Sequence, residues 1–213
     1  MTIHPRLNDR GQPVQIPNPH VPTAISAWES SSALATVVPD GLMPAHVNGI
    51  PIESWACVPA TKEVWAELAS KTLFNEPPFE PMGMEPAAGA VVVECDGRVW
   101  LVAPTKAFGG YKATFPKGKT EDFGLHATAI KETFEESGLQ VELFAHLVDV
   151  SRSTSRTRYY LARRLGGNPS AMGWETQAVH LAPVARLKEL LNNKNDLPIV
   201  KALQEALSHS SRK

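Results

Sequence analysis

Three glutamates, Glu132, Glu135 and Glu136, crowd together in the segment FPKGKTEDFGLHATAIKETFEESGL, residues 115–139. On a helix, which turns 100° per residue, they fall within an arc of about 100°. Glu132 and Glu136 are then like charges four residues apart, which destabilises a helix by roughly 0.2–0.5 kcal/mol. Lys131 is spaced to neutralise Glu135 only. A divalent cation would relieve the repulsion, because clustered carboxylates are ligands that Mg²⁺ and Mn²⁺ prefer.

The loop before these glutamates reads PKGK and adds a second half to the pattern. Gly118 allows a close approach of the backbone, and Lys117 and Lys119 can take up phosphate charge. A phosphate-binding loop that leads into a carboxylate helix is the arrangement expected for a metal ion bridging protein and polyphosphate. The alternative is an acidic helix face that is simply solvated.

The segment GKTEDFGLHATAIKETFEESGL resembles the Nudix box, G-x5-E-x7-R-E-U-x-E-E-x-G-U, in which U is a bulky aliphatic residue. The positions that match the box are Gly118, Glu132, Glu135, Glu136, Gly138 and Leu139. The segment departs from the box in four ways. It is one residue short before Glu132, Gly124 stands near the place of the first glutamate, Lys131 replaces the arginine, and Thr133 replaces an aliphatic residue.

This resemblance to the MutT-like Nudix hydrolases implies a fold and an activity. The implied fold is α/β (α+β), an α/β/α sandwich with a mixed sheet. The implied activity is Mg²⁺-dependent cleavage, with Mn²⁺ as a substitute, of a nucleoside diphosphate linked to another moiety or of a similar polyphosphate. By similarity, the metal ligands would be the Gly118 carbonyl and the carboxylates of Glu132, Glu135 and Glu136. One of these glutamates, or one from a later loop, would act as the general base.

Glu175, in the segment MGWETQAVHL, is the candidate for that later glutamate. It could serve as general base or outer metal ligand, while the preceding Trp174 could stack on a nucleobase. The structural alternative is a packed tryptophan followed by a glutamate that faces solvent.

The segment SRSTSRTRYYLARR supplies a set of arginines on an expected strand. Arg156 and Arg158 have equal parity, so they should share one face of that strand, and arginine is suited to gripping phosphates. Together with Lys106, Lys112, Lys117 and Lys119 they would form a basic mouth for a highly anionic substrate. This favours a diadenosine or diphosphoinositol polyphosphate, a branch whose TRYYLARR…WE…VHL order is similar, with ADP-ribose as a further candidate. The outer face of a soluble sheet is the alternative.

The chain divides into an N-terminal extension, 1–85, and a Nudix domain, 86–209. Thirteen of the eighteen prolines fall at or before Pro86, which favours an irregular extension with short strands at 33–38 and 49–58 and a helix at 62–74 that Thr61 could cap. The domain should contain a hairpin over 89–104, a brief strand 113–116, a helix 124–137 ended by Gly138, strands 140–150, 156–165 and 176–184, and helices near 184–192 and 197–208.

The composition of the 213 residues, with 20% charged residues and a formal net charge of −1, gives no indication of a DNA or membrane partner. No apolar run is long enough for a bilayer, and two cysteines favour a reducing, cytoplasmic setting. The extension could cover the substrate mouth or form a homodimer interface. Two rival functions remain, an RNA 5′-end pyrophosphohydrolase and a degenerate Nudix module that binds a nucleotide without efficient turnover.

Overall fold

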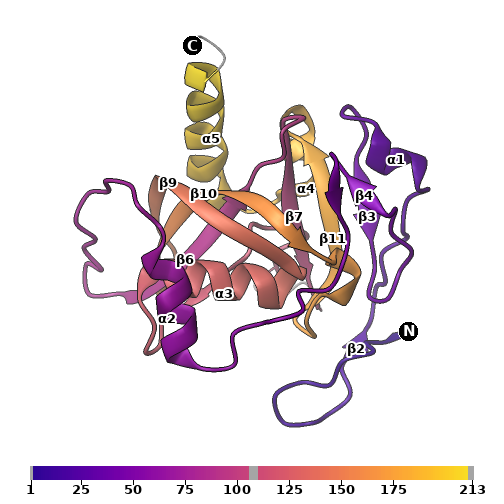
Figure 1. The fold of residues 1–213 in the computed structure, drawn as a ribbon, viewed down its shortest axis with the longest axis horizontal. Helices are drawn as coiled ribbons and strands as arrows, with labels where there is room; N and C mark the ends of the chain where they lie inside the picture. The colour runs from indigo at the N-terminus through magenta and orange to yellow at the C-terminus, as the bar shows by residue number, and fades with distance from the viewer. Residues whose placement is uncertain (1, 106–109, 211–213) are drawn as a thin grey trace.

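The computed structural model describes residues 2–105 and 110–210, which form two main β-sheets flanked by helices and two small two-stranded sheets, β1-β2 and β4-β5 (Figure 1). The first sheet has the order β8-β6-β10-β9. Its strands are β6 (Glu85–Val92), β8 (Lys117–Lys119), β9 (Leu139–Ser151) and β10 (Ser155–Gly167). β6 and β10 run parallel and the other pairs are antiparallel, so the sheet is mixed, as the sequence predicts.

The second sheet is antiparallel, with the order β3-β11-β7. Its strands are β3 (Ala35–Val37), β7 (Arg98–Pro104) and β11 (Thr176–Pro183). The predicted hairpin over 89–104 is confirmed only at its turn, where the Glu94 N–H donates to the Arg98 carbonyl at 2.9 Å and Val93 forms an isolated bridge with Val99. The strands β6 and β7 themselves lie in different sheets. Each strand instead pairs along most of its length with a distant partner, β10 or β11. The brief strand expected at 113–116 is likewise reduced to an isolated bridge between Thr114 and Val102, and β8 begins at Lys117.

Helix α3 (Leu125–Ser137) lies across the first sheet and matches the predicted helix 124–137 within one residue. It ends at Gly138, which has a left-handed φ of 70° and donates its N–H to the Phe134 carbonyl. This confirms the predicted glycine cap.

Hydrophobic cores lie on both faces of the first sheet, because alternate residues of each strand point to opposite sides. Ala88, Ala90 and Val92 belong to the core on the α3 side, whereas Val91 and Tyr159 belong to the other. The second core is closed by α4 (Leu187–Leu190) and α5 (Leu197–Ser210). Helices thus cover both faces, which gives the predicted α/β/α layering.

The N-terminal part of the chain packs into the core on the α3 side of the first sheet, which contains Trp28, Val37 and Trp65. The elements of this N-terminal part are β1 (Thr2–Ile3), β2 (Gln15–Ile16), α1 (Ser26–Glu29), β3, β4 (His46–Val47), β5 (Ile50–Pro51) and α2 (Lys62–Ser70). Strand β3 completes the second sheet, and Trp28 packs against Trp100 with ring centroids 5.8 Å apart. Helix α2 is shorter than predicted, and Thr61 holds the N-cap position without a side-chain cap bond. Among the described residues, no helix is long and apolar enough to cross a membrane.

Candidate active site

Helix α3 presents the three box glutamates (Glu132, Glu135 and Glu136) in different environments. Ala127 and Ile130 are buried against the sheet, as expected from the helical period. Glu136 is also buried, with 8% of its surface exposed, and Glu132 is partly buried, whereas Glu135 is exposed. A uniformly solvated acidic face is therefore wrong, because β8 and the chain around Gly173 cover part of the glutamate side of the helix.

Strand β8 brings the PKGK loop directly onto these carboxylates. A side-chain carbon at position 118 would collide with the Glu132 carboxylate, so glycine is what permits this close approach. The Lys117 backbone N–H donates to Glu136 Oε2 at 3.0 Å, and Lys117 Nζ lies 4.0 Å from Glu136 Oε1. The loop and the helix, predicted separately, thus form one polar site.

The electrostatics of the site show an excess of negative charge. Burial, followed by the charge of Glu136, raises the pKa of Glu132 from 4.5 to about 8. Burial also raises the pKa of Glu136 to about 7, although Lys117 opposes this through its charge and its backbone N–H. Both carboxyls hold a proton more tightly than usual because burial disfavours their charged forms and the positive charge of the nearby lysines offsets this only in part. A divalent cation would replace that proton.

Lys131, which stands in the place of the box arginine, contacts two of the glutamates. Its Nζ lies 2.5 Å from Glu135 Oε2, as the spacing predicts, and 3.7 Å from Glu132 Oε1, which it does not predict. Burial alone would lower the pKa of Lys131, but the hydrogen bond and charge of Glu135, followed by the charge of Glu132, raise it. Lys131 therefore stays positively charged beside these carboxylates.

The loop before β11 places Glu175 beside the box glutamates. The Gly173 N–H donates to the Glu135 carbonyl at 2.8 Å, which ties this loop to α3. Glu175 is exposed at the surface, but the protein around its carboxyl still removes part of its hydration, and this is the main cause that raises its pKa. The charge of Lys117 opposes the rise. The charge of Glu175 in turn raises the pKa values of Glu132 and Glu136. Residues about forty positions apart thus share one electrostatic environment.

Trp174 is half-buried beside Glu175, and hydrogen bonds hold both its backbone carbonyl and its indole ring. Its carbonyl accepts a 2.8 Å hydrogen bond from Thr105 Oγ1, and its indole Nε1–H donates to Asp9 Oδ1 at 3.0 Å. Sequence reasoning missed Asp9, which lies 165 positions earlier and is brought here by tertiary contacts alone.

The expected basic mouth is only partly present. Arg158 is 1% exposed, donates to both carboxylate oxygens of Asp149 (2.7 and 2.8 Å), and lies 3.2 Å from Glu76 Oε2. The linker between α2 and β6 covers it, since Arg158 also donates to the Pro77 carbonyl at 2.9 Å, so in this structure its guanidinium faces protein groups and not an open mouth. Arg156 donates to Ser151 at 2.7 Å on the half-exposed part of the same strand.

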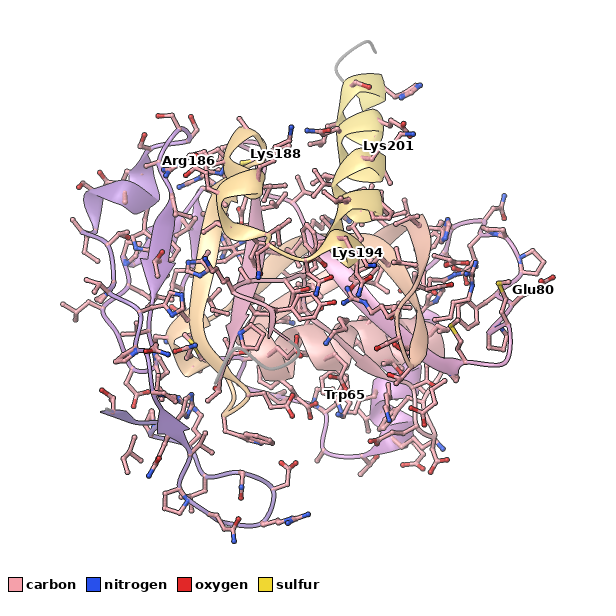
Figure 2. All side chains as sticks on the ribbon, turned by 180° about the vertical axis from the view of Figure 1, so that it is seen from behind. Trp65, Glu80, Arg186, Lys188, Lys194 and Lys201 are labelled. Atoms are coloured by element: carbon pink, nitrogen blue, oxygen red, sulfur yellow. The ribbon has the colours of Figure 1, made fainter. Side chains whose placement is uncertain are left out.

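The expected lysines have different surroundings. Lys117 faces Glu136, whereas Lys119 is 60% exposed and pairs with Glu85 at 2.5 Å. Lys112 is exposed, and Lys106 lies outside the described residues. Seen from behind, the exposed Lys188 and Lys201 project from α4 and α5, at the end of the molecule opposite the β1–β2 hairpin (Figure 2).

The donor set fits a hard divalent cation, since its side chains offer carboxylate oxygens without histidine or cysteine. Over residues 2–105 and 110–210, no group of three or more His, Cys, Asp or Glu side chains is already arranged to hold a metal ion. Lys131 and Lys117 are instead the cations near these carboxylates. Metal binding would therefore require Lys117 and Lys131 to lose part of their contacts with these carboxylates.

Comparison with protein families matches residues 83–203 to the NUDIX domain. The chain therefore belongs to the Nudix family, and this membership places it among hydrolases that cleave pyrophosphate bonds. The match begins two residues before β6 and includes the box glutamates as well as Trp174 and Glu175. No curated protein matches the chain significantly.

Three solved structures are similar to this chain at low identity. An Ap4A hydrolase from C. elegans is 17% identical, with a TM-score of 0.49 over 59% of this chain and 98% of that one. A Nudix hydrolase from Nitrosomonas europaea is 20% identical, with a TM-score of 0.47 over 61% and 73%. An ADP-ribose pyrophosphatase from Streptococcus suis is 21% identical, with a TM-score of 0.47 over 59% and 91%.

Proposed function

We propose that this protein is a Mg²⁺-dependent pyrophosphohydrolase that cleaves a nucleoside diphosphate linked to another moiety or a similar polyphosphate. Diadenosine and diphosphoinositol polyphosphates are the favoured substrates, and ADP-ribose is the next candidate. The observation that carries the proposal is the contact of the Glu132 carboxylate with the Gly118 backbone, beside the buried Glu136 that Lys117 holds. A phosphate-binding loop and an acidic cluster with unusually high proton affinity meet at this point.

Each group has a defined task in this mechanism. When bound, a divalent ion would withdraw charge from the pyrophosphate and lower the pKa of an attacking water. The Gly118 carbonyl and the three box glutamates would hold it, and Lys117 and Lys119 would bind phosphate oxygens. Glu175 would accept the proton of the water, because the raised pKa of its carboxyl strengthens it as a base.

The proposal is tested by product release from a panel of pyrophosphates, measured with and without Mg²⁺ or Mn²⁺. The panel contains ADP-ribose, diadenosine polyphosphates, diphosphoinositol phosphates, nucleoside triphosphates and 5′-triphosphorylated RNA. We expect turnover that requires the metal and that is lost in Glu136→Gln. The matched control is Glu205→Gln on α5, where the carboxylate is 62% exposed and remote in the sequence from the site.

A degenerate binding module is the second candidate, and two features favour it. Gly124 stands near the place of the first box glutamate, and Lys131 lies on the carboxylates in place of the arginine. Lysine keeps the charge but lacks the bidentate geometry of arginine. Nucleotide binding without turnover of any compound in the panel would support this candidate over the hydrolase.

We also propose that the protein acts in the cytoplasm and that residues 1–85 are an extension of a Nudix domain at 86–209. The contacts of Asp9 and of β3 support a role of the extension in completing the domain and its mouth. Sedimentation of the full chain tests the further proposal of a homodimer through this extension.

A further inference from the structure

The β1–β2 hairpin is docked next to the candidate active site through a buried histidine. His4 is 2% exposed, and its Nε2–H donates to the Thr176 carbonyl at 3.0 Å, one residue after Glu175. Its Nδ1 accepts the Arg6 N–H at 3.0 Å, which fixes the neutral tautomer. Burial favours this form because it lowers the pKa of His4. The buried Val14 and Ile16 complete the docking, so the hairpin has a defined position.

The turn of this hairpin fixes the place of Asp9. Asn8 Oδ1 accepts the N–H groups of Arg10 and Gln12 at 3.0 and 2.9 Å, and Gly11 supplies the left-handed φ of 70° that closes the turn. Asp9 therefore sits at the tip of an internally bonded turn. From there its carboxylate accepts the Trp174 indole N–H, and its charge is one of the smaller causes that raise the pKa of Glu175.

Trp174 consequently has little freedom, since its carbonyl is bound by Thr105 and its indole edge by Asp9. The ring is half-buried, so part of it stays accessible beside Glu175. A fixed aromatic ring next to a phosphate site is a stacking surface for a nucleobase, and the gain is larger when the ring is held before binding.

We propose that Asp9 is a positioning residue that holds Trp174 as a stacking platform, so that the N-terminal hairpin selects polyphosphates that carry a nucleobase over those that do not. This inference rests on the proposed function, in that the polyphosphate occupies the site of the box glutamates. It assigns to the extension a task in substrate choice, and among the substrates proposed above it favours diadenosine polyphosphates and ADP-ribose over diphosphoinositol polyphosphates, which carry no base.

The test measures equilibrium binding to the full chain with Mg²⁺, using two ligands that resist hydrolysis. These are α,β-methylene ADP, which carries a base, and methylenediphosphonate, which does not. Asp9→Ala should lower the affinity for α,β-methylene ADP by about 3- to 10-fold, the usual range for one hydrogen bond. It should leave the affinity for methylenediphosphonate unchanged. Asp9→Asn should restore the affinity, because its amide oxygen can accept the same indole N–H.

Two further variants separate positioning from general docking of the hairpin. Trp174→Ala should weaken α,β-methylene ADP by about tenfold or more, and adding Asp9→Ala to it should have no further effect. Asp40→Asn disrupts the exposed ion pair between Arg6 and Asp40 (3.1 Å) without touching Trp174, and it should leave both affinities unchanged. If Asp40→Asn weakens the nucleotide as much as Asp9→Ala does, the proposal is wrong.

The binding assay keeps this inference separate from the proposed function. If the wild type turns over none of the compounds in the panel, the proposed hydrolase activity is refuted. The effect of Asp9→Ala on ligand binding can still be measured. Equal nucleotide affinity of wild type and Asp9→Ala overturns the inference even if the enzyme is active. A wild type that binds α,β-methylene ADP no better than methylenediphosphonate overturns it as well.

Discussion

Replacing Glu132 by glutamine should stabilise the metal-free protein while it abolishes activity. The carboxyl of Glu132 has a pKa of about 8 instead of 4.5, chiefly because of burial and the neighbouring Glu136. A carboxyl with a raised folded-state pKa contributes stability that is present below pH 4.5 and is lost as the pH rises through 8. Above pH 8 the folded wild type therefore carries an unfavourable buried charge that glutamine does not have.

The size of this effect follows from the shift. A pKa difference from 4.5 to about 8 corresponds to about 5 kcal/mol. The side chain retains 17% exposure and Lys131 lies 3.7 Å away, so we expect relaxation to leave about 2–3 kcal/mol. For a chain of this length that is a rise in melting temperature of about 4–12 °C.

The assay is thermal unfolding of metal-free wild type and Glu132→Gln at pH 5 and pH 8.5, with Glu205→Gln as the exposed control. The melting temperature of Glu132→Gln should exceed that of wild type at pH 8.5 and only slightly at pH 5. Glu205→Gln should melt at the same temperature as wild type. Adding Mg²⁺ at pH 8.5 should stabilise the wild type more than the variant, because the ion binds the folded site. Identical melting temperatures of wild type and Glu132→Gln at pH 8.5 would refute the electrostatic reasoning.

Three further outcomes follow from contacts at and around the site. Gly118→Ala should keep the fold, since the added methyl group clashes only with the movable Glu132 carboxylate. It should reduce kcat by about 100-fold, because that carboxylate is displaced from its place in the site. An unchanged kcat would contradict this reasoning. Arg158→Met removes the two hydrogen bonds that Asp149 accepts from the guanidinium and leaves this covered carboxylate with His146 at 3.3 Å, so it should lower the free energy of unfolding in urea by about 3–5 kcal/mol with KM unaltered. A selective rise in KM would instead favour a place for Arg158 in the substrate mouth. Gly138→Ala should lower the free energy of unfolding by more than about 1 kcal/mol, because the φ of Gly138 is 70° and a side chain there would strike the Asn168 carbonyl. Equal urea midpoints of wild type and variant would count against this prediction.

The acidic helix and its end could be predicted from the sequence because they depend on local spacing. The 3.6-residue period fixes which side chains share a face, and a glycine ends the helix where the backbone needs a left-handed residue. The pairing of Lys131 with Glu135 is equally local and was confirmed at 2.5 Å. The family resemblance rests on the same short segment, so the family could be recognised without any tertiary information.

The tertiary structure alone decided the strand partners and the covering of polar faces. Parity placed Arg156 and Arg158 on one side of a strand, but only the folded chain shows that the linker covers Arg158. The apolar runs of β6 and β7 predict strands, yet local pattern cannot tell that their main partners are β10 and β11 rather than each other.

The same reason explains the burial of Glu136 and the contact of Asp9 with Trp174. Both depend on segments that are distant in sequence, β8 in one case and the N-terminal hairpin in the other. Sequence periodicity determines which groups a helix or strand offers, because it reflects backbone geometry over a few residues. Long-range packing determines which of those groups are dehydrated, neutralised or left open to a substrate, and this packing sets the proton affinities of the candidate site.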